Sequence, residues 1–262
     1  MSEAARSVPP AGETAEADEA VGSASHRALL RLRELIVSGE LPADLRIPEL
    51  SLVERLGVSR TPVRAALARL AEEGLLKALA GGGYAPRDFS ETDIVDAIEL
   101  RGTLEGLAAR LAAERGAGAV VMAGLRDCVA RIDALLAPPE LSEPAFDGYA
   151  LQNGRFHQLL AEACGSSLVQ RQIQRAATLP FASANSFVMV SATGPAARDA
   201  LVVAQAQHRA VLEAIAQREG ARAESLMREH ARIAQTNLQQ ALQSQQALQC
   251  LPGARLIRLA GR

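Results

Sequence analysis

Three of the four histidines in this chain lie in its second half, at His157, His208 and His230. Asn153 precedes His157 by four residues, so in a helix the two side chains share a face. His208 and His230 fall on two neighbouring helical stretches, and antiparallel helices can point both imidazoles into a bundle at similar depth. Three imidazoles with one oxygen ligand are typical of a Zn²⁺ or Ni²⁺ site. Spacing alone leaves open the alternative that each is an ordinary core or surface histidine.

A second group of residues suits nucleic-acid binding. The window 55–69 contains Arg55, Arg60, Arg64 and Arg69 and no acidic residue. Arg60 and Arg64 are four residues apart and project from one face of a helix. An arginine can bind O6 and N7 of guanine through two hydrogen bonds, or it can hold a phosphate. On charge alone, a solvated helix face explains the window equally well.

The overall composition excludes several classes of protein. The 262 residues carry a net charge of −2, which divides into −4 over 1–23, +2 over 24–90 and zero over 91–262. Aromatic residues make up 3% of the chain and tryptophan is absent, which argues against stacking on single-stranded bases. No apolar run approaches the roughly 18 residues of a membrane span, and no signal-peptide pattern is present, so we expect a cytoplasmic protein without a membrane partner.

Short helices and a hairpin are expected to position the arginines. We expect 1–23 to be a disordered tail, because it has almost no large apolar side chains. Gly57 supplies the left-handed residue that ends a helix, and Ser59 is a candidate N-cap for the next one. The glycines 81–83 between two apolar runs predict a β-hairpin. Helices are predicted over 24–38, 49–56 and 60–74.

A tight turn between two short helices is the helix-turn-helix signature, and the hairpin adds a wing. Such a module places its second helix in the major groove of duplex DNA, with Arg60 and Arg64 toward the bases. Ser59 and Thr61, near the free N–H groups of the helix start, suit a phosphate. Gly82 in the wing is the fifth predicted DNA contact. The alternative is a plain helical hairpin with solvated arginines.

The remainder of the chain has a helical pattern interrupted by glycine and proline. We expect a bundle of six or seven antiparallel helices in a domain over 91–248, followed by a C-terminal tail over 249–262. The fold class is therefore mainly α, with a winged helix-turn-helix domain over 24–90 and a C-terminal all-α antiparallel helical bundle. The helical stretches fall at 92–115, 118–137, 144–163, 166–179, 195–218 and 221–248.

The sequence LGVSRTPVR at 56–64, with AALARLAEEGL after it, resembles the winged helix-turn-helix of GntR-type bacterial transcription regulators. The resemblance covers about residues 27–90. Ala65 stands where the family usually has Glu, and Pro42-Ala43-Asp44 stands where it usually has a Pro-Gly loop. The resemblance implies a transcription regulator that binds a double-stranded DNA operator, not an enzyme.

The second domain is similar to the FCD effector domain of the FadR-like branch of these regulators. That branch has a metal motif, Asp-x3-His followed by two histidines about 22 residues apart, and it matches Asn153, His157, His208 and His230 with Asn in place of Asp. The neutral Asn implies weaker metal binding, or a shell completed by an anionic effector. Arg101 matches a family arginine near the metal, and with Asn153 it implies an organic carboxylate effector; the alternative for Arg101 is an interhelical ion pair.

The stretch 179–183, together with Phe187, is similar to vanillate-responsive members of the family, which implies an aromatic acid. The family resemblance further implies a homodimeric repressor on a palindromic operator, released when a small carboxylate binds. Two rival functions remain open. One is a metal-dependent enzyme that uses the three histidines, although no HExxH signature is present. The other is an architectural protein that binds DNA constitutively.

Overall fold

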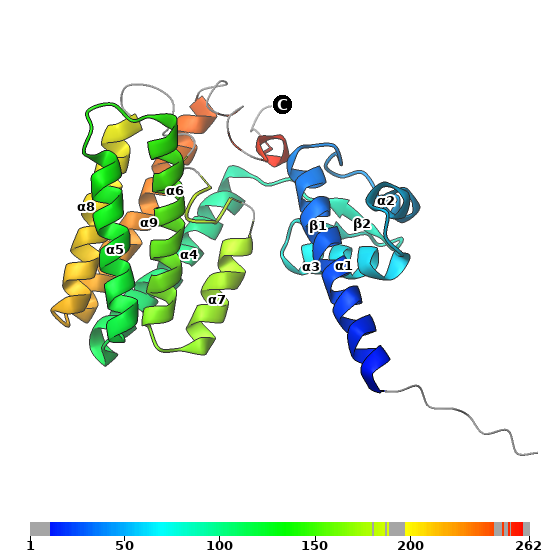
Figure 1. The fold of residues 1–262 in the computed structure, drawn as a ribbon. Coiled ribbons are helices and arrows are strands. Elements are labelled where there is room, and N and C mark those ends of the chain that lie inside the picture. The colour runs from blue at the N-terminus through cyan, green and yellow to red at the C-terminus, as the bar shows by residue number, and fades with distance from the viewer. Residues whose placement is uncertain are drawn as a thin grey trace, which may run out of the picture. The chain divides into compact units, whose positions relative to one another are not determined.

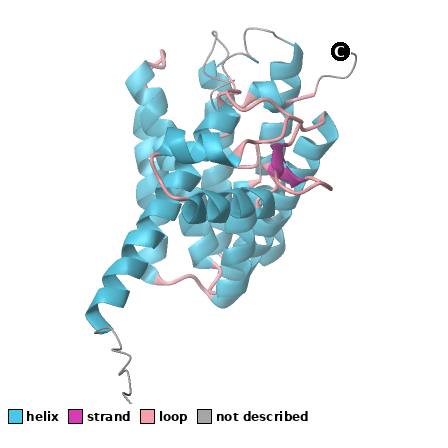
Figure 2. Cartoon of the chain, turned by 90° about the vertical axis from the view of Figure 1, so that its right-hand side faces the viewer, coloured by secondary structure: helices cyan, strands magenta, loops and turns pink. Residues whose placement is uncertain are grey.

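The computed structural model describes residues 11–179, 181–186, 188, 197–243, 248, 251 and 253–258, with only the backbone for 11–23 and 197. The chain divides into two compact units, Met1–Asp88 and Phe89–Arg262. Both units are mainly helical, and the described strands form one small hairpin (Figures 1 and 2). None of the described helices combines the length and the apolar character that a membrane span requires.

The first unit is built on two crossing helices, α1 and α3. Leu32 and Ile36 of α1 and Leu67 and Leu70 of α3 are fully buried, at the helical spacing that the sequence predicts. The elements of this unit are α1 (Ala11–Val37), α2 (Glu49–Leu56), α3 (Arg60–Glu72), β1 (Leu76–Ala78) and β2 (Tyr84–Pro86). Helix α1 begins at Ala11, so the prediction of a disordered tail through residue 23 is corrected from that point. Alanine and glutamate dominate this stretch, and both have high helix propensity.

Gly57 and Asp44 are two of the residues of this unit with a left-handed backbone. Gly57 ends α2 with φ of 64°, as its position in the sequence predicts. Asp44 has φ of 63° and occupies the loop where the related family usually has Pro-Gly. An aspartate tolerates this conformation better than most residues with a Cβ, so the departure from the family pattern preserves the shape of the loop.

The predicted hairpin is present, with shorter strands than the apolar runs suggest. β1 and β2 are antiparallel, and Lys77 lies opposite Ala85. The tip needs Gly82 and Gly83, whose φ values are 80° and 78°. The loop before α2 runs along the outer edge of β2, because Ile47 donates its N–H to the carbonyl of Tyr84 at 2.8 Å.

The second unit is an antiparallel bundle of helices (Figure 1). Ser90 and Asp93 form a capping box that starts the first helix, with reciprocal hydrogen bonds of 3.1 and 2.9 Å. The helices are α4 (Glu91–Arg115), α5 (Ala119–Leu136), α6 (Glu143–Ala163), α7 (Ser167–Thr178), α8 (Ala197–Ala216) and α9 (Gly220–Gln243).

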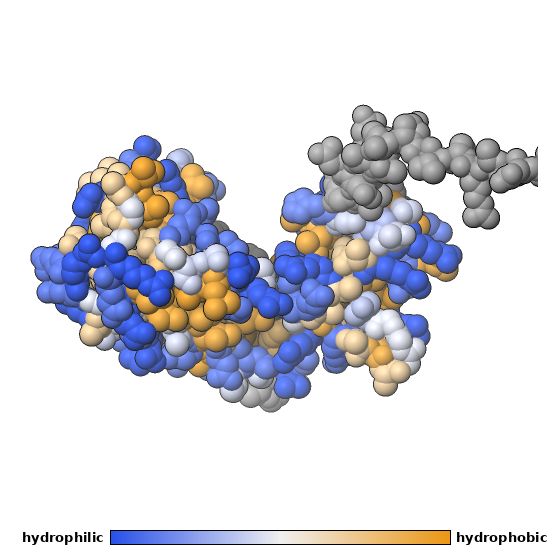
Figure 3. All heavy atoms as spheres, turned by 90° about the horizontal axis from the view of Figure 1, so that it is seen from below, coloured by the Kyte–Doolittle hydropathy of each residue, from blue (hydrophilic) through white to orange (hydrophobic). Residues whose placement is uncertain are grey.

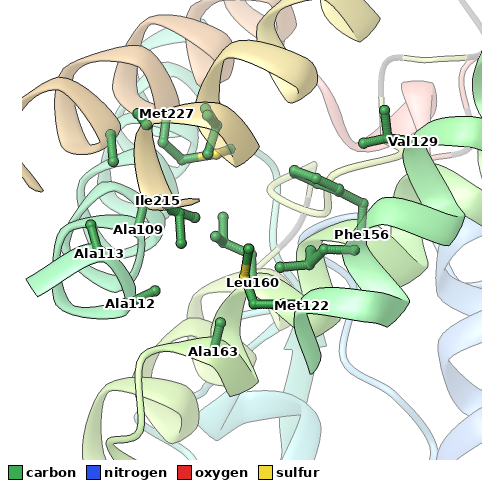
Figure 4. Close-up of a cluster of buried hydrophobic side chains, with 14 of the residues drawn as sticks. Ala109, Ala112, Ala113, Met122, Val129, Phe156, Leu160, Ala163, Ile215 and Met227 are labelled. Carbon is green, nitrogen blue, oxygen red and sulfur yellow. The ribbon is translucent and has the colours of Figure 1, made fainter. Parts of the chain in front are cut away.

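The bundle core combines small residues on α4 with large ones on the other helices. Ala109, Ala112 and Ala113 of α4 face Phe156 and Met227, among others (Figure 4). Alanines let neighbouring helices approach closely, and the larger side chains fill the space between them. The core is continuous with the polar site described below, because the rings of Phe156 and His208 lie 4.3 Å apart at their centroids.

Part of the predicted C-terminal tail, residues 253–258, has local structure within the second unit. After α9, a short 3₁₀ helix η2 (Ala254–Leu256) leads to a parallel bridge between Phe89 and Ile257. Phe89 donates its N–H to the carbonyl of Leu256 at 2.7 Å and accepts one from Arg258 at 2.8 Å. Leu251, Leu256 and Ile257 are buried, so apolar burial holds this segment in place.

Candidate metal centre and nucleic-acid interface

Three buried histidines from three helices meet inside the bundle. Nε2 of His230, on α9, lies 3.2 Å from Nε2 of His208, on α8, and 3.3 Å from Nε2 of His157, on α6. The side chains are at most 8% exposed. The tertiary structure thus brings together the three histidines that the sequence analysis singled out.

The orientation of each imidazole is set by an oxygen atom behind it. An N–H at Nδ1 suits a carboxylate or amide oxygen, and it leaves the lone pair on Nε2 directed at the other histidines. The contacts at Nδ1 are His157 to Oε1 of Glu105 at 2.9 Å, His208 to Oε1 of Gln205 at 3.1 Å, and His230 to Oε1 of Gln207 at 3.2 Å.

The electrostatics favour neutral rings at His208 and His230. Burial, reinforced by the neighbouring histidines, holds the pKa of both well below the ordinary value. The Nε2 lone pairs of these two rings then point at one another with no proton between them, an arrangement that a cation relieves. Two nitrogens bound to a tetrahedral Zn²⁺ at about 2.0–2.1 Å lie about 3.3 Å apart. The donor set and its spacing therefore fit a divalent transition metal.

Glu105, which the sequence analysis did not single out, connects the histidines to Arg101. Both side chains are buried on α4, and Nη1 of Arg101 donates to Oε2 of Glu105 at 2.6 Å. Burial by itself would raise the pKa of Glu105, but Arg101 and His157 outweigh it, and the pKa is lowered. Glu105 is therefore an anion that orients His157. The i, i+4 spacing of Arg101 and Glu105 was a signal for this pair in the sequence.

Arg101 is thus in an ion pair within one helix, not between helices as one alternative had it. It is also absent from the side chains that line the cavity beside the histidines. Its Nε is buried without a hydrogen-bond partner in the described part of the chain.

A small cavity, partly open to solvent, lies between α6, α8 and α9 beside His230. Asn153 also lines it. The Nδ2 group of Asn153 donates to Oδ1 of Asn185 at 2.7 Å and to the carbonyl of Ala184 at 3.3 Å. These bonds occupy the amide nitrogen and leave its oxygen for another partner. The two other polar lining residues are Tyr149 and Asn237; they lie on the same helix faces as Asn153 and His230, but the sequence analysis missed them.

Residues 179–183, predicted with Phe187 to contact an aromatic acid, lie only partly near the cavity. Phe181 packs edge-on against Phe89, with ring centroids 6.0 Å apart, and does not line the cavity. Ala184 and Val188, just after the stretch, do line it. Pro180 and Phe187 lie outside the described residues.

The five predicted DNA contacts are all exposed on the first unit. Ser59 occupies the N-cap position of α3, and its side chain makes no capping hydrogen bond. Arg60 and Thr61 follow in the first turn of the helix, and Arg64 lies one turn on. Gly82 is at the tip of the wing.

The window 55–69 contains no acidic residue, but the fold brings glutamates from outside the window next to three of its arginines. Nε of Arg64 lies 2.9 Å from Oε2 of Glu49 on α2, and Arg55 pairs with Glu40. Arg69 pairs with Glu73 at 3.1 Å. These partners come from elements that the fold brings alongside α3 or from the end of α3 itself.

Two arginines of this unit, Arg60 and Arg46, have no acidic partner among the described residues. Arg46 was missed by the sequence analysis because it lies outside the window. Its guanidinium is beside the wing, so close that a Cβ added to Gly83 would meet Nε at 3.1 Å. The unpaired guanidiniums thus lie at the start of α3 and at the wing, the two places where a winged module touches DNA.

Two family descriptions match the chain. Residues 96–232 match the FCD domain, and residues 24–85 match the bacterial regulatory proteins of the gntR family.

Several named relatives are transcriptional regulators. An uncharacterized HTH-type regulator from the TAR-I ttuE-ttuC' intergenic region of Agrobacterium vitis is 34% identical over 60% of this chain and 86% of its own length. The repressor GlaR of Escherichia coli is 27% identical over 76% of this chain and 88% of its own. A probable D-xylose utilization operon repressor of Paenarthrobacter nicotinovorans is 42% identical, but this chain spans only 34% of its length.

Solved structures share the fold. Lar, described as controlling the Listeria monocytogenes agr system, has a TM-score of 0.57 at 17% identity, covering 81% of this chain and 95% of that one. E. coli McbR/YncC has a TM-score of 0.55 at 18% identity, covering 82% and 95%.

Proposed function

Because the chain belongs to the GntR family of bacterial transcription regulators and carries an FCD effector domain, we propose that it is a repressor released from its operator by a small carboxylate. The observation that carries the proposal is the convergence of three buried histidines beside a cavity. The chain is a regulator and not an enzyme, in agreement with its relatives.

For DNA recognition, we propose that α3 enters the major groove with Arg60 and Arg64 toward the bases. Ser59, Thr61 and Gly82 contact the backbone. The exposure of all five supports this assignment, and so does the unpaired guanidinium of Arg60. A DNA-binding role of this kind places the protein in the cytoplasm.

We further propose a homodimer on a palindromic operator, with half-sites about one helical turn apart. The second unit exposes several large apolar side chains, including Leu100, Leu151 and Val203. Hydrophobic patches are visible between hydrophilic ones on the face of this unit in Figure 3. Light scattering of the full-length protein gives the oligomeric state directly, and a monomer at micromolar concentration would contradict the dimer.

For the metal, the proposed ligands are His157, His208 and His230, with the amide oxygen of Asn153 as a fourth. A bound Zn²⁺ or Ni²⁺ would supply positive charge for a carboxylate, which would add a fifth ligand or replace the amide oxygen of Asn153. The chain itself orients the three rings through Glu105 and two glutamines. Asn153 adds no negative charge, which leaves more of the positive charge of the ion for an anionic effector.

The effector acts by preferring one of two arrangements of the dimer. The effector can change DNA affinity only by the difference between its binding free energies for the two dimer arrangements. Such a coupling free energy is typically about 1–3 kcal/mol. Aromatic acids such as vanillate are the first candidates, on the resemblance of residues 179–183. A constitutive architectural protein would show no such coupling.

Operator selection from a random duplex pool, followed by gel-shift titration with and without carboxylates, tests this function. We expect nanomolar operator binding that weakens about 5- to 150-fold with the right acid on metal-loaded protein. The sensor role would be contradicted if no carboxylate changed the DNA affinity or the melting temperature of the protein, with or without Zn²⁺.

A further inference from the structure

The end of the cavity away from the histidines is lined by two neutral polar side chains. Tyr149 lies on α6 eight residues before His157, and Asn237 lies on α9 seven residues after His230. Helices α6 and α9 run in opposite directions (Figure 1), so Tyr149 and Asn237 share one end of the cavity. At a rise of 1.5 Å per residue, that end is roughly 10 Å from the histidines.

Tyr149 is well placed to recognise a polar group. Its side chain is 1% exposed, and burial raises its pKa, so the hydroxyl stays protonated. A buried tyrosine hydroxyl usually has a hydrogen-bond partner. None of the hydrogen bonds within the described part of the chain involves this hydroxyl, and the residue faces the cavity. A ligand in the cavity can supply the partner.

The same end of the cavity offers nothing that would neutralise an anion. The described lining contains no lysine, arginine, aspartate or glutamate. An anionic group placed at Tyr149 and Asn237 would lose its hydration without gaining an ion pair, which is costly.

We propose that Tyr149 binds a neutral oxygen of the effector, and that the effector is therefore a monocarboxylate with an apolar body and a hydroxyl or similar oxygen at its far end. A dicarboxylate is disfavoured at this site. This inference rests on the proposed carboxylate-sensing function and defines its ligand class. The alanine, valine, leucine and isoleucine side chains of the lining receive the apolar body.

Calorimetric titration of full-length, Zn²⁺-loaded protein with two matched sets of acids tests the inference. The ring set is benzoate, 4-hydroxybenzoate and terephthalate; the chain set is butyrate, 4-hydroxybutyrate and succinate. In at least one set, we expect the hydroxy acid to bind about tenfold more tightly than the plain acid, the ratio expected for one hydrogen bond. The dicarboxylate should bind most weakly of the three.

Variants assign the effect to the residue. Tyr149→Phe should cost the hydroxy acid about tenfold in affinity and leave the plain acid within twofold. Tyr84→Phe, in the wing of the other unit, is the matched control and should change neither. Tightest binding of a dicarboxylate, or an equal loss for hydroxy and plain acids in Tyr149→Phe, would overturn the inference while leaving a carboxylate sensor intact. Binding of none of the six acids would overturn the inference together with the proposed function.

Discussion

Glu105 lies 2.9 Å from Nδ1 of His157, and this contact decides which nitrogen of His157 faces the other histidines. Arg101, ion-paired to the other carboxylate oxygen at 2.6 Å, keeps Glu105 ionised in a buried position. The two α4 residues therefore act on the candidate metal centre without being ligands themselves. Their position resembles the carboxylate–histidine pairs that tune metal ligands in general.

The first prediction concerns Glu105. Glu105→Gln should weaken Zn²⁺ affinity about 10- to 100-fold, because the partner of His157 loses its charge, whereas His208→Ala should eliminate stoichiometric binding. Competition with a chromophoric chelator measures both. Glu99→Gln, the same change at an exposed position of α4 that pairs with Arg228, is the control. Equal affinities of Glu105→Gln and Glu99→Gln would contradict the orienting role.

The second prediction concerns the Asn at the position of the family aspartate. Asn153→Asp should raise Zn²⁺ affinity by at least about tenfold, since a full negative charge is added next to a dication. The same variant should bind a carboxylate effector less tightly. Without metal it should lose about 1–3 kcal/mol of stability, because Asn185 and Ala184 lose their donor. An unchanged Zn²⁺ affinity would remove Asn153 from the ligand set.

The third prediction concerns the close approach of α4 and α9. A Cβ added at Gly102 would lie 2.5 Å from Cβ of Ala231, next to His230. Gly102→Ala should therefore cost about 1–3 kcal/mol in unfolding free energy by overpacking, and it should weaken Zn²⁺ binding. Gly118→Ala, where nothing lies within 4 Å of the new Cβ, is the control for urea unfolding. A neutral Gly102→Ala would mean that α4 and α9 have room to separate.

The fourth prediction concerns the unpaired arginines. Arg60→Ala should reduce operator affinity by about 1–3 kcal/mol and relax base preference at one position. Arg46→Ala should lower affinity for operator and unrelated duplexes alike, and it should reduce the slope of log affinity against log salt by about one. Gel-shift titrations at several salt concentrations measure these effects. Arg131→Ala, the same charge change on the bundle surface, should leave both quantities as they are.

The fifth prediction concerns the C-terminal segment. Leu256 is 2% exposed beside Phe89, so Leu256→Ala should destabilise the second unit by about 2–3 kcal/mol. Arg255→Ala changes the exposed neighbour and should leave the melting temperature unaltered. Differential scanning calorimetry compares the two variants. Identical melting curves would show that the segment contributes no stability.

Local features were predictable because their causes lie within a few residues. The αL glycine after α2, the N-cap position of Ser59 and the glycines of the hairpin each follow from backbone geometry. The burial of Leu32, Leu67 and Leu70 follows the helical periodicity of the sequence. The same reasoning erred at residues 11–23, where weak amphipathicity concealed a high helix propensity.

Contacts between distant residues were not predictable in this way. The window around Arg64 lacks acids in sequence, yet Glu49, fifteen residues earlier, neutralises that arginine across the turn. Arg46 gained its position by the wing because the loop before α2 follows β2. Residues 253–258 belong to the predicted tail, and only the backbone bridge to Phe89, far away in the sequence, shows where they lie.

By itself, the sequence determined a winged helix-turn-helix module, an all-helical second domain and a small set of residues able to bind DNA or a metal. Periodicity, capping and turn chemistry suffice for that, since they act along the chain. Three relations were decided by the tertiary structure alone. Nε2 of His230 lies 3.2 Å from Nε2 of His208 and 3.3 Å from Nε2 of His157. Glu105 contacts the opposite nitrogen of His157, and Tyr149 and Asn237 line the far end of the cavity. These relations depend on how three helices align and rotate, and close packing of side chains from the whole bundle sets that arrangement.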